Sequence, residues 1–244
     1  MKKTLLKIKE ASFSVPSIET PILDKINYEV FSGDFVIILG SNGSGKSTLL
    51  KLIDKRISSN NGKVLLEEKD INNYSANEYS QKVKTLTQNC NDSLFPSLTI
   101  FENYALVKRK FTMNQKNERE FLAEYLHQFN PRFSTKLDQI VDELSGGEKQ
   151  TLALALTILN PPLLLLLDEH TSALDPKTAE LNMKLTKEMI IKNDITCLLT
   201  THNLNIAEHY GNRILAIRYG EILARIEPEE KHSLSNKLMH QMFY

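Results

Sequence analysis

The sequence predicts an α/β fold: a mixed, largely parallel sheet, with an N-terminal antiparallel β subdomain and an inserted α-helical subdomain. Three features of the sequence predict it. Strand-like runs separated by turn residues open the chain, buried apolar runs later alternate with helical segments, and a long helical stretch interrupts that alternation. The 244 residues, 41% of them hydrophobic, are enough for one large domain with its own core.

The opening segment indicates an antiparallel sheet followed by a strand–loop–helix unit. Strand-like runs at 5–13 and 26–31 alternate with turn residues, which are Pro16 and Pro21 between them and Ser32-Gly33-Asp34 after the second. A continuous apolar run follows at 35–39, as expected of a strand that is buried on both faces. A glycine-rich turn then leads into a helix, which we expect from about Thr48.

The middle of the chain indicates an inserted helical lobe and then a return to the core. The pattern is mostly helical from 97 to 159. Buried-strand character returns at 163–167 and again at 195–199, and the amphipathic helix between them carries Leu181, Leu185 and Met189. Alternation of this kind builds a parallel α/β core.

The end of the chain indicates a hairpin and a tail. The hairpin pairs 214–217 with 221–226, and a polar, helical tail follows it. We therefore expect one domain whose parts are a core with its β subdomain at 1–96 and 160–227, a helical lobe at 97–159, and a C-terminal tail at 228–244.

Composition excludes several classes of function. Thirty basic residues balance thirty acidic ones, so no global field draws the chain to nucleic acid or to anionic lipid. The longest apolar stretch, 152–167, is interrupted by Asn160 and two prolines and is too short to span a bilayer. The N-terminal ten residues lack the apolar region of a signal peptide. We therefore expect a cytoplasmic protein that meets a membrane only through a protein partner.

The two cysteines suggest no metal site. Cys90 and Cys197 lie far apart and lack the spacing of zinc ligands, and they do not form a disulfide framework. We expect both to be buried, inert thiols.

A phosphate-binding loop lies between the predicted strand at 35–39 and its helix. The pattern G-x-x-x-x-G-K-[ST] is matched by Gly40, Ser41, Asn42, Gly43, Ser44, Gly45, Lys46, Ser47 and Thr48. Its glycines let backbone N–H groups converge on phosphate oxygens, Lys46 adds a positive charge, and the Ser47 hydroxyl can bind Mg²⁺. The alternative is a plain glycine-rich turn, but the strand before the loop and the helix after it favour a P-loop NTPase core.

Two carboxylates follow the five-leucine strand at 163–167. Asp168 and Glu169 come at the carboxyl edge of the sheet, where open α/β folds bind their ligands. Asp168 is placed to hold Mg²⁺, and Glu169 to orient and polarise an attacking water molecule. The alternative is a solvated acidic turn at the end of a buried strand.

A second glycine-rich segment runs from Leu144 to Gln150. Its residues Ser145, Gly146 and Gly147 precede a helix expected at about 148–159, so its backbone donors could face a phosphate. Taken alone, Ser-Gly-Gly is also an ordinary helix-entry turn. The segment resembles the signature motif of the ABC ATPase superfamily.

Further motifs follow the order of that family. Gln88 lies where the family has its Q-loop, 172–175 resembles the D-loop, and Thr201-His202 resembles the switch histidine. Without this resemblance, a histidine at a strand end is more often structural. The resemblance covers about 5–227, and it implies that the predicted core is a RecA-like catalytic core.

The resemblance implies a head-to-tail dimer that binds ATP and Mg²⁺. Each ATP would lie between the phosphate loop of one copy and the signature segment of the other. Ser145 and Gly147 would then contact the γ-phosphate in trans, His202 would hold it in cis, and Gln88 would help to bind the metal and link it to the helical lobe. Hydrolysis, with Glu169 aligning water, would open the dimer.

The resemblance also implies partners. The chain would be the ATPase subunit of an ABC transporter, more in keeping with an importer, at the cytoplasmic face of the membrane. Its partners would be membrane-spanning permease subunits and, for an importer, a substrate-binding protein, with no nucleic acid. One alternative is a soluble ABC ATPase that assembles cytosolic partners such as an iron–sulfur scaffold. Another is a non-catalytic scaffold, against which Lys46, Glu169 and His202 together argue.

Two positions depart from the family pattern. Where members stack adenine on an aromatic ring this chain has Val15, and Phe13, on the same face of the predicted strand, could replace it. Most members have proline after the glutamate, whereas this chain has His170. The Asp-Glu-His-Thr sequence resembles a branch of amino-acid importer ATPases.

Overall fold

The computed structural model describes residues 3–16, 19–108 and 115–233, and the chain divides into two compact units. The sheet unit comprises Met1–Thr85, Pro162–Glu169 and Ile190–Tyr244, and the helical unit comprises Leu86–Pro161 and His170–Met189. The domain boundaries given above stay a prediction. Most of the predicted tail, 234–244, lies outside the described residues.

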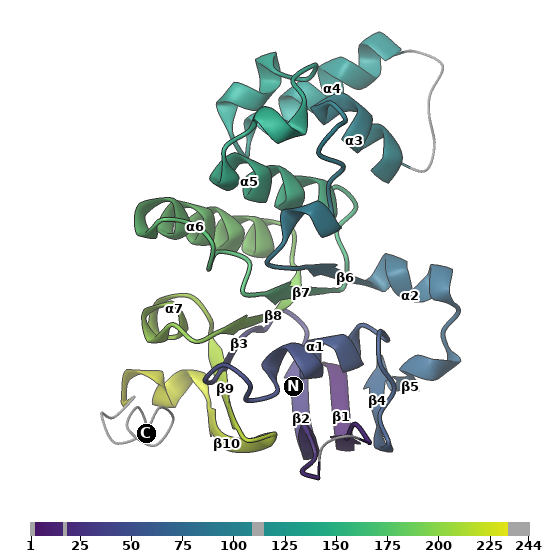
Figure 1. Cartoon of the computed structure of the whole chain (residues 1–244), viewed down its shortest axis with the longest axis vertical. Coiled ribbons are helices and arrows are strands. Elements are labelled where there is room, and N and C mark those ends of the chain that lie inside the picture. The colour runs from purple at the N-terminus through teal and green to yellow at the C-terminus, as the bar shows by residue number, and fades with distance from the viewer. Residues whose placement is uncertain (1–2, 17–18, 109–114, 234–244) are drawn as a thin grey trace. The chain divides into compact units, whose positions relative to one another are not determined.

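The N-terminal sheet of the sheet unit is antiparallel, as predicted (Figure 1). Its strand order is β2-β1-β4-β5, with β1 at Thr4–Phe13, β2 at Leu23–Phe31, β4 at Asn61–Leu66 and β5 at Lys69–Asp70. In β2 the side chains of Ile26, Tyr28 and Val30 are buried and their neighbours are not, the period of two that a half-buried strand requires.

The central sheet is mixed and has the strand order β10-β9-β3-β8-β7-β6. Its strands are β3 (Phe35–Leu39), β6 (Val83–Leu86), β7 (Leu164–Asp168), β8 (Thr196–Thr201), β9 (Arg213–Arg218) and β10 (Glu221–Ile226). Strand β8 runs parallel to β3 and β7, β9 runs parallel to β3, and β10 forms the predicted hairpin with β9. The carboxyl ends of β3, β7 and β8 therefore meet at one edge.

The hydrophobic core of the sheet unit joins both sheets to helix α1 (Lys46–Ile53). Leu6 of β1, Ile38 of β3, Leu50 of α1 and Leu164 of β7 belong to one buried cluster. Burying an aliphatic side chain of this size contributes roughly 1.5–3 kcal/mol. This packing holds the first turn of α1 at the carboxyl edge of the central sheet. The other helices of this unit are α2 (Ala76–Lys82), α7 (Leu204–His209) and the 3₁₀ helices η1 (Ile71–Asn73) and η5 (Pro228–Ser233).

The helical unit confirms the predicted helical segment. Its helices are α3 (Ile100–Val107), α4 (Gln115–His127), α5 (Gly146–Thr157) and α6 (Pro176–Lys192, whose last residues belong to the sheet unit), with 3₁₀ turns η2 (Cys90–Asp92), η3 (Pro131–Thr135) and η4 (Val141–Glu143). The Tyr104 hydroxyl of α3 donates to Glu118 of α4 (2.6 Å), and the Tyr125 hydroxyl of α4 donates to the Ala155 carbonyl of α5 (2.8 Å). These hydrogen bonds, the first buried and the second partly buried, join three helices of the unit.

Helix α6 buries only part of the apolar ladder that its sequence indicates. Met189 is buried and Leu185 is half-buried, but Leu181 is 58% exposed. The polar Asn182 and Thr186 are buried instead. Asn182 Oδ1 accepts a hydrogen bond from Thr151 Oγ1 (2.9 Å), and the Thr186 hydroxyl donates to the Asn182 carbonyl (2.7 Å). Because these polar groups are hydrogen-bonded, they can be buried at little cost, and the buried face is shifted from the one that apolar periodicity predicts.

The two cysteines differ in burial. Cys197 is fully buried in β8, and burial raises the pKa of its thiol well above the ordinary value, as expected of an inert thiol. Cys90 is only half-buried, so the expectation of burial was wrong for this residue. It lies in η2, a short turn none of whose residues is buried.

None of the helices in the described ranges is both long enough and apolar enough to span a bilayer.

Candidate functional site

The phosphate loop leaves β3 and ends at the first turn of α1. Gly45 caps α1 with φ +104°, and a Cβ atom there would lie 2.8 Å from the Ile22 carbonyl oxygen, so only glycine fits. A Cβ on Gly40 would approach the Ile217 carbonyl oxygen to 2.4 Å. Helix α1 has no side-chain cap and no acidic residue in its first turn. Its first N–H groups and the positive end of its dipole can therefore face an anion.

Lys46 is held at the loop by the loop's own carbonyl groups. Its side chain is only 4% exposed, and its Nζ donates to the carbonyls of Gly40 (2.9 Å) and Ser41 (3.0 Å). A buried ammonium is costly unless it is hydrogen-bonded, so these contacts fix where its charge lies. That place is beside the Gly40 and Ser41 carbonyls at the start of the loop.

Asp168 and Ser47 meet at the carboxyl edge of the central sheet. Asp168 ends β7, and its Oδ1 accepts hydrogen bonds from Ser47 Oγ (2.9 Å) and from Thr200 Oγ1 (2.6 Å). A hydroxyl and a carboxylate oxygen in direct contact form the kind of oxygen donor set that Mg²⁺ prefers. The two predicted metal ligands of this unit thus fit that ion.

Glu169 has an unusual backbone conformation. Its φ is +45°, and its N–H is directed to the carbonyl (3.3 Å) and hydroxyl (3.1 Å) oxygens of Thr200. A left-handed conformation is costly for a residue with a side chain and is found where surrounding contacts impose it, often at functional sites. Here it turns the carboxylate between Lys46 Nζ (3.5 Å) and His202 Nδ1 (3.4 Å).

The sheet unit therefore brings together five predicted site residues, Lys46, Ser47, Asp168, Glu169 and His202. Sequence reasoning missed Thr200, which contacts both acidic residues. The available signal was a pair of hydroxyl residues, Thr200-Thr201, at the end of an apolar strand. Phe13 lies elsewhere in the same unit, partly buried against the hydrophobic core, and its role as an adenine platform stays a prediction.

The signature segment forms the start of α5 in the helical unit. Ser145 caps the helix in a capping box: its Oγ accepts from the Glu148 N–H (3.3 Å), and the Glu148 carboxylate accepts from the Ser145 N–H (3.0 Å). Burial alone would raise the pKa of Glu148, but these hydrogen bonds hold it below its ordinary value. The turn is therefore fixed with Ser145 at the helix N-terminus.

The two glycines of that segment have different surroundings. A Cβ on Gly147 would lie 2.4 Å from Thr178 Cγ2 of α6, so close packing within the unit explains this glycine. A Cβ on Gly146 would meet its nearest neighbour, Leu174, at 3.6 Å, an ordinary contact. Packing within the described chain does not require glycine at 146, which leaves close approach to another molecule as a reason for it.

Gln88, Ser145, Gly146 and Gly147 belong to the helical unit, and their roles towards ATP stay predictions. Gln88 is exposed and lies two residues beyond the end of β6.

His170 is a buried, neutral histidine. Its side chain makes a 3.2 Å hydrogen bond between Nε2 and Thr186 Oγ1. Because the Thr186 hydroxyl already donates to the Asn182 carbonyl, its oxygen accepts from His170 and the hydrogen lies on Nε2. Burial lowers the pKa of His170 from 6.5 to about 4.

His170 should make the fold sensitive to acid. His170 binds a proton near pH 6.5 in the unfolded chain but only near pH 4 in the folded chain. Its contribution to the free energy of unfolding is therefore fully present above pH 6.5 and is lost as the pH falls towards 4. These two pKa values correspond to about 2 kcal/mol of unfolding free energy lost at pH 5. Urea unfolding at pH 7 and pH 5 should show that loss reduced in His170→Gln. It should persist in His209→Gln, which removes an exposed histidine. Equal pH dependence in all three proteins would contradict the assignment.

Known proteins of similar sequence and structure indicate the family of this chain. A family model described as "ABC transporter" matches residues 23–172. The tyrosine transport ATP-binding protein of Clostridioides difficile is 35% identical over 242 residues, which cover 95% of each chain. The phosphonates import ATP-binding protein PhnC 1 of Oceanobacillus iheyensis is 28% identical over 239 residues, covering 90% of this chain and 87% of that one. The dimeric ATP-binding cassette MJ0796, solved in a post-hydrolysis state with ADP and Pi, superposes with a TM-score of 0.75 at 28% identity, covering 92% of this chain and 99% of that one.

Proposed function

The chain belongs to the ABC transporter family and is an ATPase of that family, and we propose that it drives amino-acid import through separate membrane subunits. The observation that carries the catalytic part is the cluster at the carboxyl edge of the central sheet. That edge holds a buried lysine and a hydroxyl–carboxylate pair. It also holds a second carboxylate, which contacts both the lysine and a histidine.

The proposed roles follow from the contacts of each residue. The loop N–H groups and Lys46 bind the β- and γ-phosphates, and Ser47 and Asp168 hold Mg²⁺, which supplies charge neutralisation on the phosphate oxygens. Glu169, turned out of β7, orients and polarises the attacking water. His202, which is half-exposed and beside Glu169, binds the γ-phosphate from the other side.

We propose that two copies complete each site. The cassette MJ0796 is a dimer in its ADP and Pi complex, and it resembles this chain over nearly its whole length. In such a dimer Ser145 and Gly147 of one copy would contact the γ-phosphate held by the other. Two features support this: Ser145 stands at the N-terminus of α5, where the helix dipole favours an anion, and Gly146 leaves space that packing within its unit does not use.

The proposed cargo and location come from the relatives. The Clostridioides difficile relative is named for tyrosine transport and the Oceanobacillus iheyensis relative for phosphonate import. We take an amino acid as cargo because the tyrosine protein is the more similar of the two, and we place the chain at the cytoplasmic face beside permease subunits. The alternative of a soluble ATPase that assembles cytosolic partners is not favoured, because both relatives are named for transport.

Uptake by cells tests this proposal. Disrupting the gene in its host should abolish high-affinity uptake of radiolabelled tyrosine and leave phosphonate uptake intact. The wild-type gene and Glu221→Gln, a matched change at an exposed glutamate of β10, should restore uptake, whereas Glu169→Gln should not. Unchanged tyrosine uptake in the disrupted strain would contradict the amino-acid cargo. Rescue by Glu169→Gln would contradict coupling to hydrolysis.

A further inference from the structure

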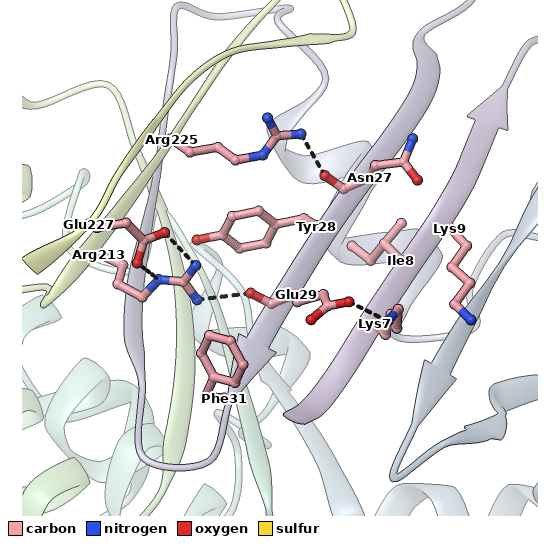
Figure 2. Close-up of a pocket in the computed structure, with 10 residues that line it drawn as sticks. All are labelled: Lys7, Ile8, Lys9, Asn27, Tyr28, Glu29, Phe31, Arg213, Arg225 and Glu227. Atoms are coloured by element: carbon pink, nitrogen blue, oxygen red, sulfur yellow. Dashed lines mark hydrogen bonds and ion pairs between the residues drawn. The ribbon is translucent and has the colours of Figure 1, made fainter. Parts of the chain in front are cut away.

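The sheet unit contains a pocket that shares no residue with the phosphate-loop site. Its volume is about 500 Å³, within the range of small-molecule pockets. It opens between β1 and β2 of the N-terminal sheet and the β9–β10 hairpin (Figure 2). Its lining residues are Lys7, Ile8, Lys9, Asn27, Tyr28, Glu29, Phe31, Arg213, Arg225 and Glu227. The lining contains four basic side chains and two acidic ones, whereas basic and acidic residues are equal in number over the whole chain.

The acidic groups of the pocket are already neutralised. Glu29 pairs with Lys7, and Glu227 accepts two hydrogen bonds from Arg213 (2.8 and 2.7 Å). Arg213 also pairs with the buried Asp34 (2.9 Å), so its guanidinium has its charge balanced by two carboxylates. These pairs build the wall of the pocket and leave no uncompensated negative charge in it.

Two basic groups keep free donors. Arg225 uses one nitrogen, Nη2, to donate to the Asn27 carbonyl (2.9 Å), and within the described residues neither Arg225 nor Lys9 has a carboxylate partner. A guanidinium has five N–H donors, so most of those on Arg225 remain available. The pocket therefore carries positive charge that the described protein does not balance.

Tyr28 adds a neutral donor to the same space. Only 5% of Tyr28 is exposed, and its ring lies in the pocket with the hydroxyl directed towards Arg213 and Glu227 (Figure 2). Its hydroxyl makes no hydrogen bond with any described residue and is not among the fully buried polar atoms, so it stays open to the space of the pocket. Burial raises the pKa of Tyr28 to about 12, so the hydroxyl stays protonated at neutral pH.

We propose that this pocket binds a small oxyanion, a carboxylate or phosphate group, which the Arg225 guanidinium and the Tyr28 hydroxyl hold and the charge of Lys9 attracts. Charge-assisted hydrogen bonds from arginine to such groups are strong and directional. One ligand would then use the Tyr28 hydroxyl and the remaining N–H donors of the exposed Arg225, none of which is bonded to a described residue. Neither residue touches the phosphate-loop site, so this ligand is separate from ATP.

The experiment measures anion binding with the phosphate loop filled. The full chain, saturated with ADP, is titrated calorimetrically with inorganic phosphate and with malonate, and its sedimentation with phosphatidylglycerol vesicles is measured in parallel. Arg225→Gln should weaken anion binding about tenfold or more, the value of one strong charge-assisted contact. Tyr28→Phe should weaken it several-fold without lowering the unfolding temperature, because the lost hydroxyl had no protein partner.

Arg218→Gln is the matched control. It removes the same charge from the same hairpin, but Arg218 lies outside the pocket, beside Tyr219. Binding that is lost in Arg225→Gln and kept in Arg218→Gln supports the site. If phosphate or malonate binds with this dependence on Arg225, the ligand is a free small molecule. If the chain binds only to the vesicles, the ligand is a lipid headgroup. Failure of all probes to bind at 10 mM, on the order of the weakest useful affinity, would overturn the proposal. So would binding that both pocket variants leave unchanged.

Discussion

Replacing Glu169 with glutamine should lower kcat for ATP hydrolysis by about 100-fold or more while ATP still binds. The amide has the shape of the carboxylate but carries no negative charge, so it cannot polarise the attacking water. The phosphate contacts of the loop and of Lys46 remain in place. ATP that binds but is not hydrolysed should hold two chains together.

Light scattering after size-exclusion chromatography measures that dimer directly. Glu169→Gln, washed free of carried nucleotide, should elute as a monomer without ATP and as a dimer with Mg²⁺-free ATP. The Glu221→Gln control should keep wild-type turnover. Rapid turnover by Glu169→Gln would remove Glu169 from catalysis. A persistent monomer with undiminished ATP binding would mean that membrane subunits are needed to hold the dimer.

Much of the fold follows from patterns that are local in sequence. The fully buried run of β3 and the leucine run of β7 predict parallel central strands, and parallel strands bring their carboxyl ends to one edge. Strand β4 carries no such signal, because its first half, Asn61-Gly62-Lys63, is exposed and polar. It forms because Val64 and Leu66 pack in the core and its backbone pairs with β1, a contact distant in sequence.

The residues of the candidate site likewise divide into those that a local motif predicts and those that depend on tertiary structure. Lys46, Ser47 and Asp168 could be predicted because each belongs to a short motif with its own physical reason. Thr200 has only a weak signal, the pair Thr200-Thr201 at the end of an apolar strand, because threonine is also an ordinary strand former. Its role comes from the register of two strands, which pairs Thr200 with Asp168 and so directs its hydroxyl to the carboxylate. Register is a tertiary property that one strand's sequence does not contain.

Lys46→Ala should reduce ATP affinity by at least about 100-fold, because removing one partner of a buried, hydrogen-bonded charge contact costs roughly 3–5 kcal/mol. The lysine is 4% exposed and donates to carbonyls of the loop, so its charge is held where phosphates would bind rather than in solvent. Equilibrium binding of ATP measures the loss. Lys51→Ala removes an exposed lysine from the same helix and should bind as the wild type does. Unchanged affinity in Lys46→Ala would contradict the phosphate-loop assignment.

The same variant tests whether two chains share a site. Ser145→Arg places a bulky cation where the signature segment would meet the γ-phosphate, so neither Ser145→Arg nor Lys46→Ala should hydrolyse ATP alone. In a mixed dimer, the intact phosphate loop of the Ser145→Arg chain faces the intact signature of the Lys46→Ala chain, and one working site results. Mixing the two should therefore restore part of the wild-type ATPase activity, in proportion to the mixed dimers formed. Mixed dimers without recovered activity would mean that each chain's loop works with its own signature segment, or with none.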